Sequence, residues 1–472
     1  MLKDQKKKDL KKVTLQCLEG EFKVFIGASI VPNYNPKLTL RSVRFKNAVL
    51  SELTNASFRH VHENLINYGR CVLGVSTLKD LTERTAQEIH ESYTHQRDEI
   101  LSGNGFCPTT GLPLDSDEWA ERCSQAPAAM DKRDLAGKIK EFNDLNGRAD
   151  DPGSLIRTIR FAETIESSKD SIVQIDADEV MTKKQTFERD RSNVVKPSIS
   201  ARGKVRASQR KLNKRKVKAR HNKKSHFDSI AVSSYNNEQK NVNTTVIRVK
   251  WDENLHVIKG ESVSEAFKSL IALLLENGLM TTRRLVFFID GASSLKKTIQ
   301  TMFSYASYHI VLDWYHITVS IMQMLSMALS GKIDQKRGYR SELTRPLWHG
   351  DVSGSLSVLK SFVKKNLVRN STAFDRVSKY LLKKQDEISC YALRKHMGLP
   401  NSSSQGEKFN DILVASRQKH NGMSWSVVGS NDLSRITAAN VNNKLLMFLQ
   451  SPEKVNWFNV SNVSNEDRSS VA

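Results

Sequence analysis

The chain has few cysteines, and their spacing excludes several protein classes. Its 472 residues include five cysteines, and no two of them form a Cys-x-x-Cys pair. An odd number of widely spaced cysteines is not a disulfide framework, and structural zinc sites usually take their ligands in close pairs. The pattern predicts a reduced, cytoplasmic protein without a structural zinc ion. The cysteines are Cys17, Cys71, Cys107, Cys123 and Cys390.

Long apolar runs are also missing. No stretch approaches the roughly 18 apolar residues that a membrane-spanning helix needs. The lysine-rich start, MLKDQKKKDLKK, is not followed by the apolar segment of a secretory signal. We therefore expect neither a membrane location nor export.

Acidic residues are in deficit, with 51 Asp and Glu against 73 Lys and Arg, a net charge of +22. Such an excess predicts a polyanionic partner, most often nucleic acid, although a generally basic surface is an alternative. Residues 183–224 hold 17 Lys and Arg and only two acids, so this segment carries +15 of the total. It is either a solvated loop or an arm that grips phosphates. The expected DNA contacts in it are Lys211, Arg215 and Lys218.

The middle of the chain alternates between strand and helix patterns. Residues 285–289 and 308–312 are short apolar runs typical of buried strands, and 263–276 has helical spacing of apolar residues. In residues 171–185, polar and apolar residues alternate, which predicts a strand with Asp176 and Asp178 on one face. Residues 317–397 are expected to be helical. The alternation predicts an α/β layer with parallel central strands.

Three acids follow or lie on these elements. Asp290 ends the first apolar strand and Asp313 ends the second, where reacting groups collect in open α/β sheets. Glu407 is expected on a helix, on the same face as Asn410. Each acid has a simpler interpretation, since Asp caps helices and Glu is favoured in a first turn. A strand acid, a strand-end acid and a helix acid together still outline a Mg²⁺ site, because Mg²⁺ prefers hard oxygen ligands.

Four strings carry a family resemblance. They are IDADEVMTKKQ (175–185), FFIDGASSL (287–295), VLDWYHI (311–317) and GLPNSSSQGEKFNDILVASRQKHNGMSWSVVGS (398–430). In order and spacing they resemble the characteristic blocks of bacterial insertion-sequence DDE transposases. The closest neighbourhood is the Kra-type group, which is related more distantly to Mutator-like transposases. The likeness covers about residues 170–440, including a long helical stretch between the second and third acids.

Carried over to this sequence, the resemblance makes Asp178, Asp290 and Glu407 the catalytic, metal-binding acids. The usual first motif has a small residue or a second Asp after the acid, whereas Glu179 follows Asp178 here, so Asp176 remains a rival. Asp313 and His316 match a D-x-x-H block that supports the site. A core histidine bonded to Asp313 is the alternative for His316.

The segment after Glu407 resembles a DNA contact. Arg417 and Lys419 form a basic helix end, and Trp425 offers a flat surface for a DNA strand. Arg417 is also expected on the face of Glu407 and Asn410, where it could bind a phosphate. The alternative for Trp425 is a place in the core.

The resemblance implies an RNase H-like mixed sheet with flanking helices, a large all-α insertion before the last catalytic helix, and a mostly helical N-terminal region. It also implies cleavage of transposon-end phosphodiesters and transfer of the 3′-hydroxyl to target DNA. The expected cofactor is a pair of Mg²⁺ ions, with Mn²⁺ as a substitute. The expected partners are terminal inverted repeats, target DNA and at least one further copy of the chain, in a bacterial cytoplasm close to the nucleoid. A nuclease of the same fold, a non-catalytic or decayed DNA-binding protein and an RNA-binding factor are the alternatives.

The expected divisions are 1–165 (N-terminal, terminal-repeat recognition), 170–316 (core, with the basic insertion 183–224), 317–397 (helical insertion), 398–445 (core, last part) and 446–472 (polar tail).

Overall fold

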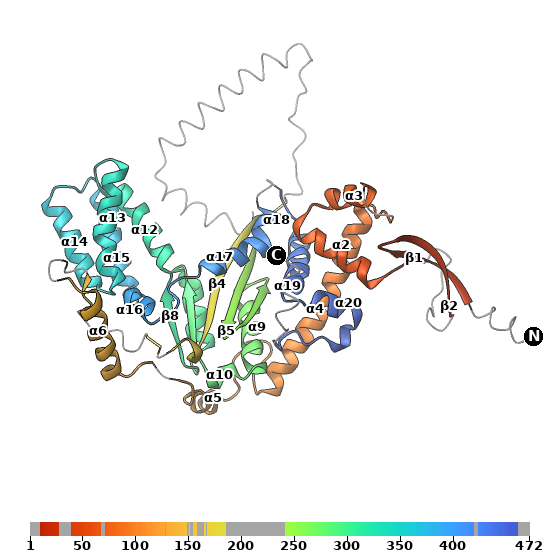
Figure 1. Ribbon diagram of the computed structural model, residues 1–472, viewed down its shortest axis with the longest axis horizontal. Helices are drawn as coiled ribbons and strands as arrows, with labels where there is room; N and C mark the ends of the chain where they lie inside the picture. The colour runs from red at the N-terminus through yellow and green to blue at the C-terminus, as the bar shows by residue number, and fades with distance from the viewer. Residues whose placement is uncertain are drawn as a thin grey trace, which may run out of the picture.

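The chain is a mixed α/β molecule built around a central sheet. The computed structural model describes residues 10–27, 39–67, 71–127, 129–148, 151, 154–157, 165–166, 168–185, 241–419 and 423–460. Figure 1 shows the sheet in the middle, helices on both sides of it, and a small sheet projecting near the N-terminus. Most of the basic segment, including Lys211, Arg215 and Lys218, lies outside the described residues.

The central sheet has five strands in the order β6-β5-β4-β7-β8. β4 pairs in parallel with β7, which pairs in parallel with β8, whereas β4, β5 and β6 are antiparallel. The predicted parallel central strands are confirmed, within a sheet that is mixed. All six residues of β7 are buried, as expected for a strand covered on both faces. The strands are β4 (Ile172–Lys183), β5 (Asn241–Trp251), β6 (Asn254–Gly260), β7 (Arg284–Ile289) and β8 (Tyr308–Leu312).

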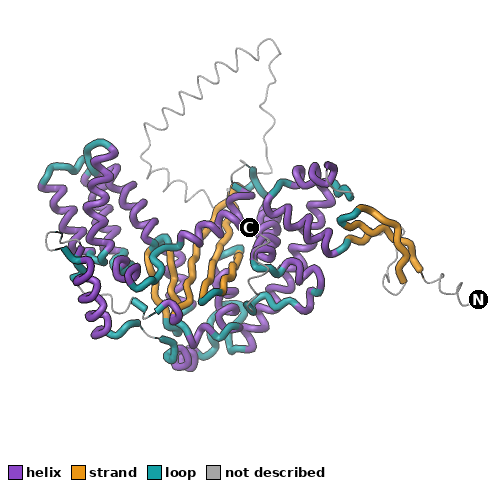
Figure 2. Tube along the Cα trace, viewed as in Figure 1, coloured by secondary structure: helices purple, strands orange, loops and turns teal. Residues whose placement is uncertain are grey.

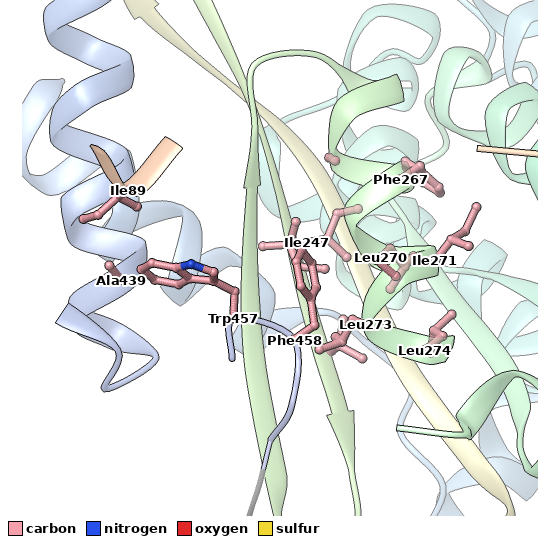
Figure 3. Packing of buried hydrophobic residues seen from close by; sticks show 14 of the residues in the cluster. Ile89, Ile247, Phe267, Leu270, Ile271, Leu273, Leu274, Ala439, Trp457 and Phe458 are labelled. Atoms are coloured by element: carbon pink, nitrogen blue, oxygen red, sulfur yellow. The ribbon is translucent and has the colours of Figure 1, made fainter. Parts of the chain in front are cut away.

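The two faces of β4 meet different surroundings. Val173, Ile175 and Ala177 join a core cluster with α9 (Val263–Glu276) and α11 (Ser293–Met302). Figure 3 shows the apolar residues of α9 gathered near Ile247 of β5. The opposite face carries Asp176 and Asp178, as the alternation predicts. Helix α9 has its predicted bounds because Ser262 caps its start and Gly278, at φ +63°, follows its end.

The helices predicted in residues 317–397, referred to below as the helical insertion, are present. Its helices pack against one face of β7 and β8, which includes Val286, Phe288 and Val311. Figure 2 shows that this part of the molecule is almost entirely helical. The helices are α12 (Trp314–Ala328), α13 (Ile333–Trp348), α14 (Val352–Lys364), α15 (Ser371–Lys383) and α16 (Tyr391–His396).

The structure divides the region expected to be one N-terminal unit at 1–165. Its first helices pack in the cluster that contains α9, whereas α6 packs in the cluster of the helical insertion, at the other end of the molecule (Figure 1). Burial of their apolar faces on different parts of the core separates them. The elements are β1 (Leu10–Cys17), β2 (Gly20–Gly27), β3 (Thr39–Arg41), α2 (Val43–Asn55), α3 (Phe58–Asn67), α4 (Val75–Gly103), α5 (Ser116–Cys123) and α6 (Lys132–Asn146).

Helix α4 spans 29 residues and is tied to the core near its C-terminal end. Gly74 precedes it without a side-chain cap. Near its end, buried Arg97 forms an ion pair of 2.5 Å with Glu265 of α9. Among the described helices, none combines the length and the apolar character of a membrane span. The five cysteines are free.

The expected polar tail is folded as far as residue 460. After α19 (Val427–Val441) and α20 (Leu445–Gln450), the chain buries Val455, Trp457 and Phe458 in the main core cluster. The indole Nε1 of Trp457 donates to Ser92 Oγ of α4 at 3.0 Å. Figure 3 shows its ring beside Ile89 and Ala439. Two aromatic side chains in a polar segment are enough to fasten it, because each removes a large apolar area from water.

We expect Trp457→Ala to lower the free energy of unfolding by about 3–5 kcal/mol, because it leaves a cavity between α4 and the core. Met447→Ala is the matched control, since the Met447 side chain is 45% exposed, and it should change stability by less than about 0.5 kcal/mol. Urea unfolding followed by fluorescence and circular dichroism measures both. Equal effects of the two variants would contradict a fastening role for Trp457.

Candidate active site

Three acids from distant parts of the sequence line one pocket. Asp178 comes from β4, Asp290 follows β7, and Glu407 lies on α17 (Ser404–Asn410). His316 of α12 and Asn410 of α17 line the same pocket. The parallel pairing of β4 with β7 places the first two acids at the same edge of the sheet. The structure therefore brings together the three acids that the sequence singled out.

Asp178 is held by two hydrogen bonds. One carboxylate oxygen accepts from the backbone N–H of Glu179 at 2.8 Å, and the other accepts from Asn410 Nδ2 at 2.5 Å. Burial raises the pKa of Asp178, and the negative charges of Asp290 and Glu407 raise it further. These acids are thus close enough to repel one another, and a bound cation would relieve that repulsion.

Asp290 lies at the tight turn that follows β7. Its Oδ1 accepts a hydrogen bond from the backbone N–H of Ala292 at 2.7 Å. Gly291 between them has φ +98°, a conformation that favours glycine. The carboxylate is exposed at the end of a buried strand, as predicted.

His316 faces the third acid. Its Nε2 lies 3.1 Å from Glu407 Oε1, with the two side chains 30% and 45% exposed. The alternative of a core histidine with its ring bonded to Asp313 is therefore wrong. The connection to Asp313 runs through the backbone N–H of His316, which donates to Asp313 Oδ1 at 3.0 Å.

Asp313 is buried and joins two parts of the site. It caps α12, as the simpler interpretation predicts. Its second oxygen accepts hydrogen bonds from the backbone N–H and the hydroxyl of Ser403, directly before α17. Asp313 thus ties the end of β8 to the start of the helix that carries Glu407, which is a supporting role.

Asp176 is committed to an ion pair. Its Oδ2 lies 2.6 Å from Arg248 Nη1 on β5, and both side chains are 2% exposed. Gln174 donates to both carboxylate oxygens, at 3.1 and 3.3 Å. The pKa of Asp176 is raised to about 6, because the effect of burial exceeds the opposing effect of the Arg248 charge. Of the two rival acids, Asp178 is the one whose carboxylate faces the other acids.

The helix α17 approaches β4 at Gly406. A Cβ at this position would lie 2.8 Å from Asp176 Cβ, closer than side chains pack. Glycine therefore allows Glu407, the next residue, to reach the strand acids. Sequence reasoning missed Gly406 and Arg248. The arginine between the apolar residues Val246-Ile247 and Val249 was the only signal for the buried pair.

Arg417 does not reach the pocket. Residues Asp411–Ala415 form a π-helical turn, whose wider winding rotates the following residues away from their predicted face. Arg417 is 4% exposed, and its guanidinium lies 5.0 Å from the ring centre of Trp425. Lys419 is exposed. Half-buried Trp425 also pairs with the end of β4, through backbone bonds to Lys183 and Gln185.

The acids share a pocket without forming a closed metal cage. Within the described ranges, no group of three His, Cys, Asp or Glu side chains is gathered closely enough to hold a metal ion as the side chains stand. The donor set nevertheless suits Mg²⁺, since it consists of carboxylate oxygens with an amide beside them.

We expect Asp176→Asn and Asp178→Asn to differ in stability although they change neighbouring acids of one strand face. The first leaves Arg248 buried without its charged partner and should lower the free energy of unfolding by about 3–5 kcal/mol. The second removes a negative charge that lies near those of Asp290 and Glu407 and leaves no buried arginine without its partner, so stability at neutral pH should be unchanged or higher. Urea unfolding at pH 7 compares them. A loss for Asp178→Asn as large as that for Asp176→Asn would refute the distinction.

Gly406→Ala should lower the free energy of unfolding by about 1–3 kcal/mol, because the added methyl group overpacks against Asp176. Gly338→Ala provides the control, since a Cβ at this helical glycine meets no atom within 4 Å. That change should be neutral or stabilising by up to about 1 kcal/mol. Thermal unfolding measures both, and a neutral Gly406→Ala would mean that α17 does not need the close approach.

Comparison with known proteins adds no assignment to this geometry. No protein-family model matches the chain. No curated protein matches its sequence. The chemistry of the site therefore has to be argued from its acids, their partners and their burial.

Proposed function

We propose that the chain is a DNA transposase that cleaves phosphodiesters at transposon ends and transfers the 3′-hydroxyl to target DNA. One observation carries the proposal: Asp178, Asp290 and Glu407 come from three elements to line one pocket. The pKa of Asp178 is raised by burial and by the other two acids. Crowded carboxylates at a sheet edge are suited to divalent cations and phosphoryl transfer.

The sheet supports an RNase H-like core. Its antiparallel half carries the first acid and its parallel half ends in the second. The third acid lies on a helix packed against β4. The all-α insertion lies between the second and third acids in the sequence, where the family resemblance requires it.

The acids fit a metal-dependent reaction. Asp178, Asp290 and Glu407 would hold two Mg²⁺ ions, for which Mn²⁺ could substitute. When bound, such ions supply activation of the attacking oxygen and neutralise charge on the phosphate. Asn410 orients the carboxylate of Asp178, and His316 orients that of Glu407.

The charge of the chain supports a DNA substrate. The net charge of +22 predicts strong, salt-dependent binding to phosphates. The basic segment begins at Lys183, the last residue of the strand that carries Asp178. Its described residues, Lys183 to Gln185, pair with Trp425 through backbone hydrogen bonds. Exposed Lys419 follows the π-helical turn in the stretch of chain that also carries Glu407. We further propose that terminal inverted repeats and target DNA are the partners, with at least two copies of the chain on the DNA.

A second candidate is a DNA-binding protein of the same fold that does not cleave. The absence, in the described part of the chain, of three potential ligands close enough for a metal ion favours it. The two candidates differ in the expected effect of Mg²⁺. Only the transposase requires Mg²⁺ and Glu407 to change the DNA.

The test uses end-labelled DNA containing the sequences that flank the gene, incubated with the full chain and Mg²⁺. We expect cleavage and joining by the wild type. Glu407→Gln should lower the rate of cleavage by at least about a hundredfold, because it removes a negative charge that would contribute to stabilising the transition state. DNA binding in a gel-shift assay should be unchanged.

Glu453→Gln, at an exposed position that does not line the pocket, is the matched control and should cleave as the wild type does. Cleavage without joining would identify a nuclease. Binding without any cleavage by the wild type would favour the non-cleaving candidate, and full activity of Glu407→Gln would remove Glu407 from the site.

A further inference from the structure

The helical insertion reaches the turn that carries the second acid. Lys384 follows α15 and is 5% exposed. Its Nζ donates a hydrogen bond to the carbonyl oxygen of Gly291 at 2.8 Å. These residues are 93 positions apart, so only the tertiary structure connects them.

The contact acts on the same peptide unit as the carboxylate of Asp290. The carbonyl of Gly291 and the N–H of Ala292 are the two polar groups of one planar peptide. Lys384 binds the carbonyl end, and Asp290 Oδ1 accepts from the N–H end. Since the peptide is rigid, fixing its carbonyl also fixes the donor that orients the Asp290 carboxylate.

Lys384 is itself fixed. Its Nζ lies 2.9 Å from Glu387 Oε2, and Glu387 Oε1 lies 2.6 Å from Lys296 Nζ of α11. The backbone carbonyl of Glu387 accepts from the N–H of Leu312, the last residue of β8. This buried group joins the insertion, α11 and the end of β8 at one point.

The space around the turn leaves little freedom. A Cβ on Gly291 would lie 3.2 Å from Leu312 Cδ1 and 3.5 Å from Lys384 Cε. One helical turn before Lys384, burial raises the pKa of Tyr380, and the charges of Glu387 and Asp290 raise it further. The end of α15 therefore interacts with Asp290 in two ways: through the effect of the Asp290 charge on Tyr380, and through Lys384.

We propose that Lys384 is a positioning residue that sets the carboxylate of Asp290 through the Gly291–Ala292 peptide, so that the helical insertion controls the geometry of the second acid. The inference rests on the proposed function, since it assumes that Asp290 is a metal ligand. A purely structural Lys384–Glu387 pair would affect stability alone. A positioning residue also changes how tightly the acids hold a cation.

The experiment measures Mn²⁺ binding to the full chain by electron paramagnetic resonance without DNA, and the Mn²⁺ dependence of DNA cleavage. Lys384→Met removes the donor but keeps the length of the side chain. We expect it to raise the Mn²⁺ dissociation constant about tenfold, as is common when a partner that orients a metal ligand is lost. Lys384→Arg should recover most of the affinity, because it restores a charged donor.

Lys383→Met is the matched control, one residue away on α15 but exposed, and should bind Mn²⁺ as the wild type does. If Lys384→Met does not fold, the double variant Lys384→Met/Glu387→Gln replaces it, because it also removes the buried Glu387 charge, which would otherwise keep Lys296 as its one remaining lysine partner of the two described. Wild-type Mn²⁺ affinity in that variant would overturn the positioning role.

Asp290→Asn and Glu407→Gln separate this failure from failure of the proposed function. If both lose Mn²⁺ while the Lys384 variants keep it, only the positioning role is wrong. If both bind Mn²⁺ as the wild type does, the acids are not metal ligands and the proposed function fails with the inference.

Discussion

The close approach of α17 to β4 is the constraint on which the candidate site depends. Gly406 packs directly on Asp176, whose charge is balanced by Arg248 beneath the helix. A larger residue or an unpaired acid at this contact would keep Glu407 away from the strand acids. A buried ion pair by itself adds little stability. The role of this pair is therefore to support the contact of α17 with β4.

Around that contact the molecule separates two kinds of acid. Acids that hold the architecture, such as Asp176 and Asp313, are buried and have all their charge directed to protein donors. The acids that face the pocket have fewer partners, and the charges of Asp290 and Glu407 raise the pKa of Asp178. This uncompensated negative charge lies within a chain of net charge +22, which suits a site that meets both cations and a polyanion.

The helical insertion is part of the site as well as a separate group of helices. Through Lys384 and Glu387 it contacts the Asp290 turn, and through Tyr391 it donates to the carbonyl of Leu312 at the end of β8. The C-terminal segment has a comparable role at the other end, where Trp457 joins α4 to the core. Segments that the sequence separates from the strands near the pocket acids thus contact the core around those strands.

The sequence by itself determined the local elements. The apolar runs at 285–289 and 308–312, the alternation of 172–178 and the capped helix 263–276 fold as predicted, because burial and capping are encoded by neighbouring residues. The acids at strand ends could be found for the same reason. The sequence also suggested the helical insertion, but it placed α6 in one unit with α2–α4 and treated the folded segment up to residue 460 as a tail.

Only the tertiary structure decided which role each acid has. Asp176 and Asp178 look equivalent along the strand, and they differ because β5 brings Arg248 beside one of them. His316 meets Glu407, and Arg417 turns away, because of packing and a π-helical turn that the residue spacing does not reveal. Ion pairs, burial and helix register depend on residues that lie tens or hundreds of positions apart, so no local pattern could determine them.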